Sequence, residues 1–300
     1  MVTRHRIAFL PRSLCLLAAA VAVSAPAAAQ QPSDHRLVWN EAWPRFRAWE
    51  YAATGVLVAG GLALEYLTRQ PREPNWESPL PGELAVRDAL AARTRSGREA
   101  AGVLSDYMWI TAQWYTQVVD ALVITFLVDD QNFDVAWQMS AMNAEAMALG
   151  FVLTRGAHRL VARSRPLELG CENDPAYDGL CPFSGSTAGF PSGHASMAFV
   201  GAGLTCAHHQ YLPIYGDAAA DLSACLGVTA LAATTGVLRI VSDSHYTSDV
   251  IAASLLGFAV GYAVPVLLHY GFGEPAREYG VGQNAAALGT TRVTLVSAGF

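Results

Sequence analysis

Lysine is absent from the 300-residue sequence, because all 19 basic residues are arginines. Charged residues are scarce at 15% of the chain, whereas about a quarter of the residues are charged in an average soluble domain. The formal net charge of −6 gives no support for nucleic-acid binding. A site that would ordinarily contain lysine must therefore use another residue. The hydrophobic content of 52% predicts either a very apolar helical protein or a membrane protein.

The sequence also lacks internal repeats and strand-like alternation, except in the tail TTRVTLVSAGF. A series of apolar segments instead predicts an all-α fold, a bundle of about six core helices. The expected helices cover residues 51–67, 107–128, 135–160, 194–209, 222–240 and 248–270. Residues 250–268 contain no charge and are long enough to span a bilayer. Polar side chains in 107–128 and 135–160 would have to face a bundle interior, so insertion into the membrane stays open.

The predicted boundaries divide the chain into four parts. Residues 1–30 are typical of a signal peptide, because arginines precede a short apolar run that ends in small residues. Residues 31–106 contain the first apolar helix and an Arg- and Pro-rich linker, residues 107–270 the catalytic helical bundle, and residues 271–300 a C-terminal tail. An uncleaved first span is the alternative for the N-terminus. We expect a protein of the cell envelope, either in the membrane with its site facing the periplasm or soluble in the periplasm.

Four cysteines remain once the predicted signal peptide is removed. An even number of cysteines in an exported chain predicts disulfides. The simplest of the three connectivities joins Cys171 to Cys181 and Cys206 to Cys225. Free buried thiols are the alternative.

The first of three chemically suggestive clusters is HRLVARSRP. His158 and Arg165 lie seven residues apart and would share one face of a helix. Arg155, Arg159 and Arg163 follow one another at four-residue spacing. Guanidinium groups present planar donors that match phosphate oxygens, which favours an anion site. A positively charged end of a membrane span is the plainer explanation.

The second cluster, GFPSGHASMAF, begins an apolar helix with Pro-Ser-Gly-His. Ser192 offers a hydroxyl, and Gly193 allows the backbone to approach an anion closely. The free N–H groups of the first helical turn would point at the same anion, and His194 on that turn could contact it. A plain N-cap at Ser192 is the alternative interpretation.

The third cluster is LRIVSDSHYTSDVI. His245 and Asp249 lie four residues apart, so they would stack on one face of a helix. A carboxylate beside an imidazole fixes its tautomer and supports its charged form. Arg239 lies just before them, across a polar turn. A purely structural His–Asp pair would explain this cluster taken alone.

Together, and in this order, the clusters resemble the type 2 phosphatidic acid phosphatase and vanadium haloperoxidase superfamily. The pattern of that family is K-x6-R-P, P-S-G-H and S-R-x5-H-x3-D, but here His158 stands in place of the lysine and Leu238 in place of the first serine. The resemblance implies a metal-free reaction through a phosphohistidine. It implies that His245 is the nucleophile, that Asp249 orients it, and that His194 acts as acid and then base. The residues implied in phosphate binding are Arg165, Arg239, Ser192, Gly193 and His158.

The predicted function is therefore that of an exported phosphohydrolase, which acts on a lipid phosphate, a diphosphate or a small phosphate ester without a cofactor. Arg155 or Arg159 could compensate for the missing lysine. One alternative is a haloperoxidase that binds vanadate at the same residues. Another is a phosphate-binding envelope protein without catalysis, which would need the arginines but no nucleophile. His208 and His209 are expected in a loop without a role, with metal binding as the alternative.

Overall fold

The computed structural model describes residues 37–173, 177 and 187–272. The predicted signal peptide, Cys181 and the strand-like tail lie outside the described residues. The described part of the chain forms the α-helices α1 (Ala48–Leu62), α2 (Glu83–Leu90), α3 (Arg95–Tyr115), α4 (Phe133–Val161), α5 (Pro166–Asn173), α6 (Gly193–Tyr211), α7 (Ala218–Val241) and α8 (Thr247–Leu268). It contains isolated β-bridges but no strand, so the predicted all-α class is confirmed.

Three shorter helical segments complete the described elements. The π-helical segment η1 (Ala63–Leu67) continues α1, and the longer π-helical segment η2 (Thr116–Val128) continues α3. A 3₁₀ turn, η3 (Tyr270–Phe272), follows α8. Because η1 and η2 prolong their helices without a break, α1 and α3 reach further along the bundle than their α-helical parts alone.

The six predicted apolar segments each correspond to a long helix, but α8 ends at Leu268 rather than at residue 270, and one helix begins much earlier than expected. The segment predicted to start at residue 107 belongs to a helix that begins at Arg95. The Thr94 hydroxyl accepts a hydrogen bond from the Gly97 N–H over 3.2 Å, which satisfies one of the free donors of the first turn. The first turns of this helix are polar, so a search for apolar runs assigns them to the linker.

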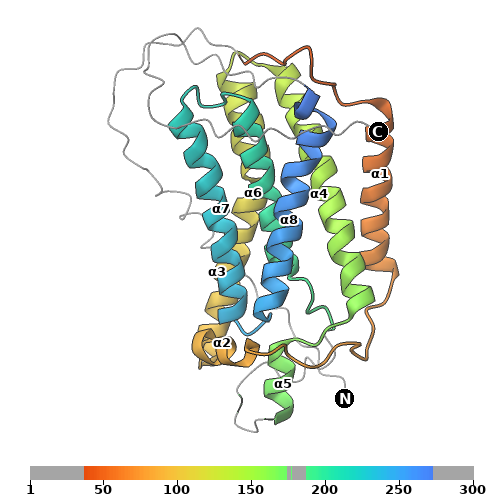
Figure 1. The fold of residues 1–300 in the computed structure, drawn as a ribbon, viewed down its shortest axis with the longest axis vertical. Coiled ribbons are helices and arrows are strands. Elements are labelled where there is room, and N and C mark those ends of the chain that lie inside the picture. Colours follow the sequence, from red (N-terminus) through yellow and green to blue (C-terminus); the bar gives the residue numbers. More distant parts are fainter. Residues whose placement is uncertain (1–36, 174–176, 178–186, 273–300) are drawn as a thin grey trace, which may run out of the picture. The chain divides into compact units, whose positions relative to one another are not determined.

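Helix α6 lies at the centre of the bundle, in contact with α3, α4, α7 and α8 (Figure 1). Its contact with α8 is very close because glycines face the α6 backbone. A Cβ atom at Gly261 would lie 2.1 Å from the Val200 carbonyl oxygen, and one at Gly257 would lie 2.2 Å from the Ser196 carbonyl oxygen. Only glycine permits this approach, which positions the start of α8 beside the start of α6.

The helices alternate in direction, so the termini gather at two ends of the bundle. At one end lie the starts of α3, α6 and α8, the ends of α4 and α7, and the short helices α2 and α5 (Figure 1). We call this the α2 end. The starts of α1 and α4 and the end of α8 lie at the other end, together with η3, and we call this the η3 end.

Two of the described helices, α7 and α8, are long and apolar enough to cross a membrane, with mean hydropathies of 1.7 and 2.1. Large apolar side chains are also exposed on the outer faces of other helices. Examples are Val56 on α1, Tyr107 on α3 and Leu127 on η2. Extensive exposed apolar surface is typical of contact with a membrane or a partner.

The cysteines on α6 and α7 form the predicted disulfide between Cys206 and Cys225, close to the η3 end. The expected pairing of Cys171 with Cys181 stays a prediction, because Cys181 lies outside the described residues. The expectation of a loop at His208 and His209 is wrong. Both belong to the last turn of α6, which continues to Tyr211 before a proline follows.

Candidate active site

The chain from Thr187 to Ser192 crosses the α2 end and connects the predicted clusters. The Gly189 N–H donates to the Arg163 carbonyl over 2.9 Å, and the Ser192 N–H donates to the Asp249 carbonyl over 3.0 Å. A Cβ atom at Gly189 would lie 2.6 Å from the Arg163 carbonyl oxygen. This segment therefore needs glycine, and it holds the start of α6 against the start of α8.

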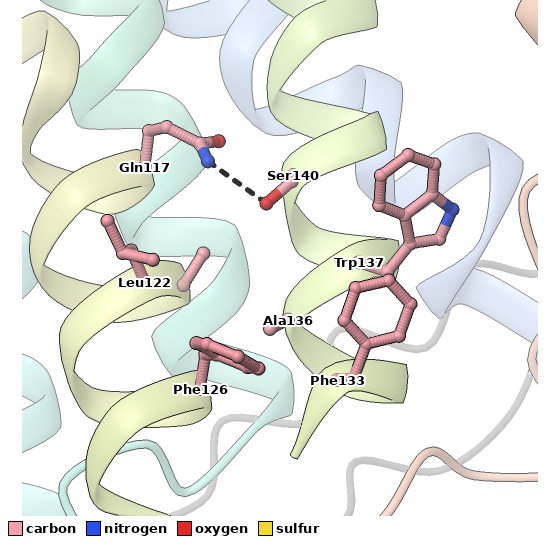
Figure 2. Close-up of a pocket in the computed structure, with 8 residues that line it drawn as sticks. Gln117, Leu122, Phe126, Phe133, Ala136, Trp137 and Ser140 are labelled. Carbon is pink, nitrogen blue, oxygen red and sulfur yellow. Dashed lines mark hydrogen bonds between the residues drawn. The ribbon is translucent and has the colours of Figure 1, made fainter. Parts of the chain in front are cut away.

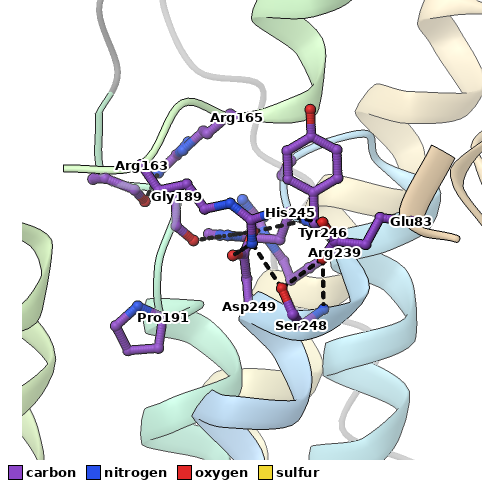
Figure 3. Close-up of polar contacts among 12 residues, drawn as sticks. Glu83, Arg163, Arg165, Gly189, Pro191, Arg239, His245, Tyr246, Ser248 and Asp249 are labelled. Atoms are coloured by element: carbon purple, nitrogen blue, oxygen red, sulfur yellow. Dashed lines mark hydrogen bonds and ion pairs between the residues drawn. The ribbon is translucent and has the colours of Figure 1, made fainter. Parts of the chain in front are cut away.

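His245 is buried between α7 and α8 and is oriented by the backbone. Its Nδ1–H donates to the Gly189 carbonyl over 2.8 Å, which leaves the lone pair on Nε2 (Figure 3). The nearest Asp249 oxygen is 3.8 Å from Nδ1, too far for a hydrogen bond. We expected Asp249 to fix the tautomer, and in the structure the Gly189 carbonyl does so. Burial, followed by Arg165 and Arg239, holds the pKa of His245 well below its usual value.

Asp249 is paired with Arg163 instead. The Arg163 guanidinium donates to Asp249 Oδ1 and, over 2.6 Å, to Glu83 Oε2 from α2 (Figure 3). It lies over the Trp76 ring at 3.7 Å and the Tyr246 ring at 4.6 Å. Arg163 is fully buried, so this contact joins α2 to the start of α8. Sequence reasoning noted Arg163 only as one of several cations and missed both Glu83 and this role.

Arg165 and Arg239, in contrast, have donors to spare. Arg165 donates to the Ala188 carbonyl over 3.3 Å, and Arg239 donates to the Ser105 hydroxyl over 3.2 Å. The Nε–H groups of both are buried without a partner among the described residues. The only carboxylate near Arg239 in that part of the chain is Asp106, at 3.8 Å, and no carboxylate there pairs with Arg165. Buried cations of this kind favour an anionic ligand.

The first turn of α6 adds uncharged donors. The Ser192 hydroxyl is buried and has no partner in the described part of the protein. The N–H groups of Gly193 and His194 begin the helix, where backbone donors have no intrahelical acceptor. A helix start with free N–H groups and a glycine is well suited to phosphate. Ser192, Gly193 and the two arginines thus supply donors of the kind expected for the oxygens of an anion.

His194 lies on this first turn and contacts α3. Its Nε2 is 3.0 Å from Asp106 Oδ1, and its ring meets the Trp109 ring edge-on at 4.9 Å. Burial, followed by Arg239 and Arg165, lowers the pKa of His194 to about 3. The Asp106 carboxylate acts in the opposite sense. Sequence reasoning missed Asp106, because it precedes the apolar part of α3 and belongs to no recognisable motif.

His158 lies in the last turn of α4, next to Gly193. A Cβ atom added at Gly193 would lie 3.6 Å from the His158 ring. The His158 Nε2–H donates to the Pro191 carbonyl over 2.8 Å. Burial, followed by Arg155 and Arg165, lowers the pKa of His158 to about 4. His158 therefore lies beside the start of α6, and its lowered pKa favours a neutral imidazole over the cation that would replace lysine.

Arg155 and Arg159, the proposed substitutes for that lysine, are engaged with the helix α1 extension. Arg155 Nε is 3.0 Å from Glu65 Oε2 in η1. Arg159 Nε–H donates to the Thr68 hydroxyl over 3.1 Å, and its Nη2–H donates to the Leu64 carbonyl. Their contacts hold α4 to η1, and none of them reaches the first turn of α6.

A separate apolar groove opens between η2 and α4 (Figure 2). Gln117 donates to the Ser140 hydroxyl over 3.0 Å at its edge. The other lining residues are almost all apolar, and sequence reasoning did not anticipate the groove. They are Ala121, Leu122, Phe126, Phe133, Ala136 and Trp137. Asp106 and the groove residue Gln117 lie on the same continuous helix, formed by α3 and η2. They are roughly 16 Å apart along its axis, at about 1.5 Å per residue.

The comparisons with known proteins agree with the three clusters. Residues 142–272 match the model of the PAP2 superfamily. The matched segment contains all three sequence clusters and every histidine and arginine of the candidate site. No curated protein and no solved structure matches the chain.

Proposed function

We propose, from the premise that residues 142–272 belong to the PAP2 superfamily, that this protein hydrolyses a phosphate ester or diphosphate in the cell envelope. The family supports phosphatase-type activity in general. One observation carries the proposal to this chain. The buried imidazole of His245 keeps its Nε2 lone pair, beside Arg165 and Arg239, which lower its pKa and have unused donors. A nucleophile beside unpaired cations suits an electrophilic phosphorus that carries negative oxygens.

In the first step, the Nε2 lone pair of His245 attacks phosphorus and the bond from phosphorus to the leaving oxygen breaks. His194 donates a proton to that oxygen, so the alcohol or phosphate leaves without an additional negative charge. The negative charge of the bound phosphoryl group offsets the arginines and favours the protonated form of His194. Arg165, Arg239 and the α6 start stabilise the charge on the equatorial oxygens.

In the second step, His194 takes a proton from water, and the water oxygen attacks phosphorus. The phosphorus–nitrogen bond breaks, inorganic phosphate leaves, and His245 recovers its lone pair. The hydrogen bond from the His245 Nδ1–H to the Gly189 carbonyl keeps Nε2 as the reacting nitrogen in both steps. All groups in this scheme come from the protein and water, so no cofactor takes part in the proposed reaction.

The lipid nature of the substrate is the finer part of the proposal. The apolar groove between η2 and α4 offers a surface for a hydrocarbon chain, at a distance that a lipid with its phosphate near His194 can span. Helices α7 and α8, which could cross a membrane, and the exposed apolar side chains also support access to lipids. The Cys206–Cys225 disulfide supports an oxidising compartment such as the periplasm.

Phosphate release separates the candidate functions. We expect the purified chain to release phosphate from an aryl phosphate, and more efficiently from a long-chain lipid phosphate. Halide oxidation after addition of vanadate and peroxide, without phosphate release, would identify a haloperoxidase. Vanadate binding without either activity would identify a phosphate-binding protein and overturn the proposed reaction.

The groove can be tested separately with Ala136→Phe, which fills it. We expect KM for the long-chain substrate to rise several-fold, while turnover of the aryl phosphate stays unchanged. Ala52→Phe, at an exposed position on α1 away from the groove, is the matched control. Equal effects of the two variants on the long-chain substrate would argue against a chain-binding groove.

A further inference from the structure

Three side chains that could bind a metal converge at the η3 end, at the opposite end of the bundle from His245. They are Glu50 from α1, Glu145 from α4 and His269, which follows α8. One carboxylate oxygen of each glutamate and one imidazole nitrogen lie within 4.8 Å of one another. Glu50 and His269 are 0% exposed and Glu145 is 5% exposed. No residue of the three belongs to the sequence clusters or to the candidate active site.

The imidazole of His269 presents a lone pair to this cluster. Its Nδ1–H donates to the Pro44 carbonyl over 2.8 Å, so Nε2 is the unprotonated nitrogen of the neutral ring. Phe46 stacks on the ring with the planes 12° apart, which fixes its orientation. Nε2 faces Glu50 Oε1 at 3.4 Å and has no hydrogen-bond partner in the described part of the chain. Two acceptors therefore point at each other inside the protein.

The carboxylates outnumber the cations at this point. Arg47 donates to Glu50 Oε1 over 2.8 Å and to Glu50 Oε2 over 2.9 Å, and it is the only guanidinium bound to the cluster among the described residues. Glu145 Oε2 is buried and has no partner there. An unpaired buried carboxylate is costly, and so is an unsatisfied buried imidazole nitrogen. A positive species between the three groups would satisfy both.

A proton shared by His269 and Glu50 is the simplest such species, but the geometry suits it poorly. Charge-assisted N–H···O bonds are about 2.7–2.9 Å long, shorter than the 3.4 Å between His269 Nε2 and Glu50 Oε1. Two ligands about 2.1 Å from a tetrahedral ion, in contrast, are roughly 3.4 Å apart. A ligand histidine usually donates its other N–H to a carbonyl or carboxylate, as His269 does to Pro44.

We propose that Glu50, Glu145 and His269 bind one divalent transition-metal ion, with Zn²⁺ as the best-suited probe. Imidazole with carboxylate favours such an ion over Mg²⁺ or Ca²⁺, which take oxygen ligands. Glu50 Oε1 can accept from Arg47 and still offer a second lone pair to the ion. The ion joins α1, α4 and the end of α8, so its role is to hold the η3 end together.

Zinc binding to the full chain, purified without a histidine tag and stripped with a chelator, tests this site. We expect one Zn²⁺ per chain after dialysis, and a higher melting temperature, because an ion that binds only the folded state stabilises it. Co²⁺ should give the visible absorption spectrum of a four- or five-coordinate ion. A wild-type chain that retains no zinc above the level of a metal-free blank would overturn the proposal.

Two nearly isosteric variants locate the ion. Glu145→Gln and His269→Gln should each weaken Zn²⁺ binding at least tenfold and abolish the rise in melting temperature. Glu41→Gln, at an exposed position that precedes α1, is the matched control and should bind like the wild type. If a variant does not fold, by circular dichroism, the other variant and the wild-type Co²⁺ spectrum still decide. Zinc retained equally by all three variants would place the ion elsewhere and overturn the assignment.

Discussion

The two ends of this bundle use similar side chains with opposite charge balance. At the α2 end, Arg165 and Arg239 are buried with unused donors, and the carboxylate nearest to Arg239 among the described residues, Asp106, is 3.8 Å away. At the η3 end, carboxylates are in excess, since His209 lies between Asp120 at 3.3 Å and Asp221 at 2.7 Å. Buried charge of one sign calls for a ligand of the other sign. The comparison therefore supports the two proposals, an anionic ligand at the α2 end and a metal cation at the η3 end.

The histidines show the same contrast in their protonation. Burial, with Arg165 and Arg239 beside it, holds the pKa of His245 well below its usual value, so the ring is neutral. Burial alone would also lower the pKa of His209, but the Asp120 and Asp221 carboxylates outweigh it and raise that pKa to about 9. A neutral imidazole can attack phosphorus, whereas a protonated one cannot. The surrounding charges therefore distinguish His245, the proposed nucleophile, from His209.

The largest expected effect is on phosphate release, and it distinguishes His245 from His209. His245→Ala should lower phosphate release by on the order of 10⁴-fold or more, because the nucleophile is lost. Vanadate should still bind, since the arginines and the α6 start remain. Rapid quench with labelled substrate should trap an acid-labile phosphohistidine in the wild type only. His209→Gln, at the other end, should keep turnover within a few-fold, and undiminished turnover in His245→Ala would overturn the mechanism.

A large effect on stability is expected at Arg163. Arg163→Gln leaves the buried carboxylates of Glu83 and Asp249 without their cation, which should cost about 3–5 kcal/mol of unfolding free energy. Arg159→Gln removes a similar but more exposed side chain from the same cluster and should cost less than about 1 kcal/mol. Urea denaturation followed by circular dichroism measures both. Similar losses in the two variants would show that the Arg163 contacts do not stabilise the fold.

The sequence predicted the helices and the candidate site residues, but it did not predict the contacts that these residues make. Apolar runs located all six long helices of the described residues, and motif spacing selected His194, His245 and the nearby arginines as candidate site residues. The partners of those residues come from distant parts of the chain. Arg163 and Glu83 are 80 residues apart, and Arg239 and Ser105 are 134 apart. No local pattern marks such contacts.

The same limit applies to protonation states and to the η3 end. The neutral state of His158 follows from burial and from neighbouring arginines, which a motif cannot show. Glu50, Glu145 and His269 lie on three elements far apart in the chain, and none has a helical neighbour that would mark it as a ligand. Sequence reasoning therefore proposed the reactive residues, but the structure was needed to show which charged groups surround them.

A smaller effect, on the pH dependence of stability, is expected at His209. Its pKa is raised from about 6.5 in the unfolded chain to about 9 in the fold. The stabilisation is therefore complete below about pH 6.5 and is lost as the pH rises to about 9, by roughly 1–3 kcal/mol. Unfolding free energies measured across this range should fall more steeply in the wild type than in His209→Gln. Parallel curves would show that His209 is not charged between Asp120 and Asp221.

The smallest effect is expected at His158, where the family has a lysine. With its pKa lowered to about 4 by burial, His158 is expected to be neutral at pH 7. Its contribution is then a hydrogen bond from Nε2 to the Pro191 carbonyl, which a glutamine amide can replace. His158→Gln should therefore reduce kcat/KM by less than about tenfold.

The pH profile decides between this neutral role and that of a cation. A cationic His158 would make wild-type kcat/KM fall as the pH rises through its pKa, and His158→Gln would lack that limb. We expect the two profiles to run parallel between pH 6 and 8 instead. His158→Lys adds the missing charge and should tighten inhibition by phosphate, because a third cation then faces the anion. A large loss in His158→Gln together with a flattened profile would restore the cationic role.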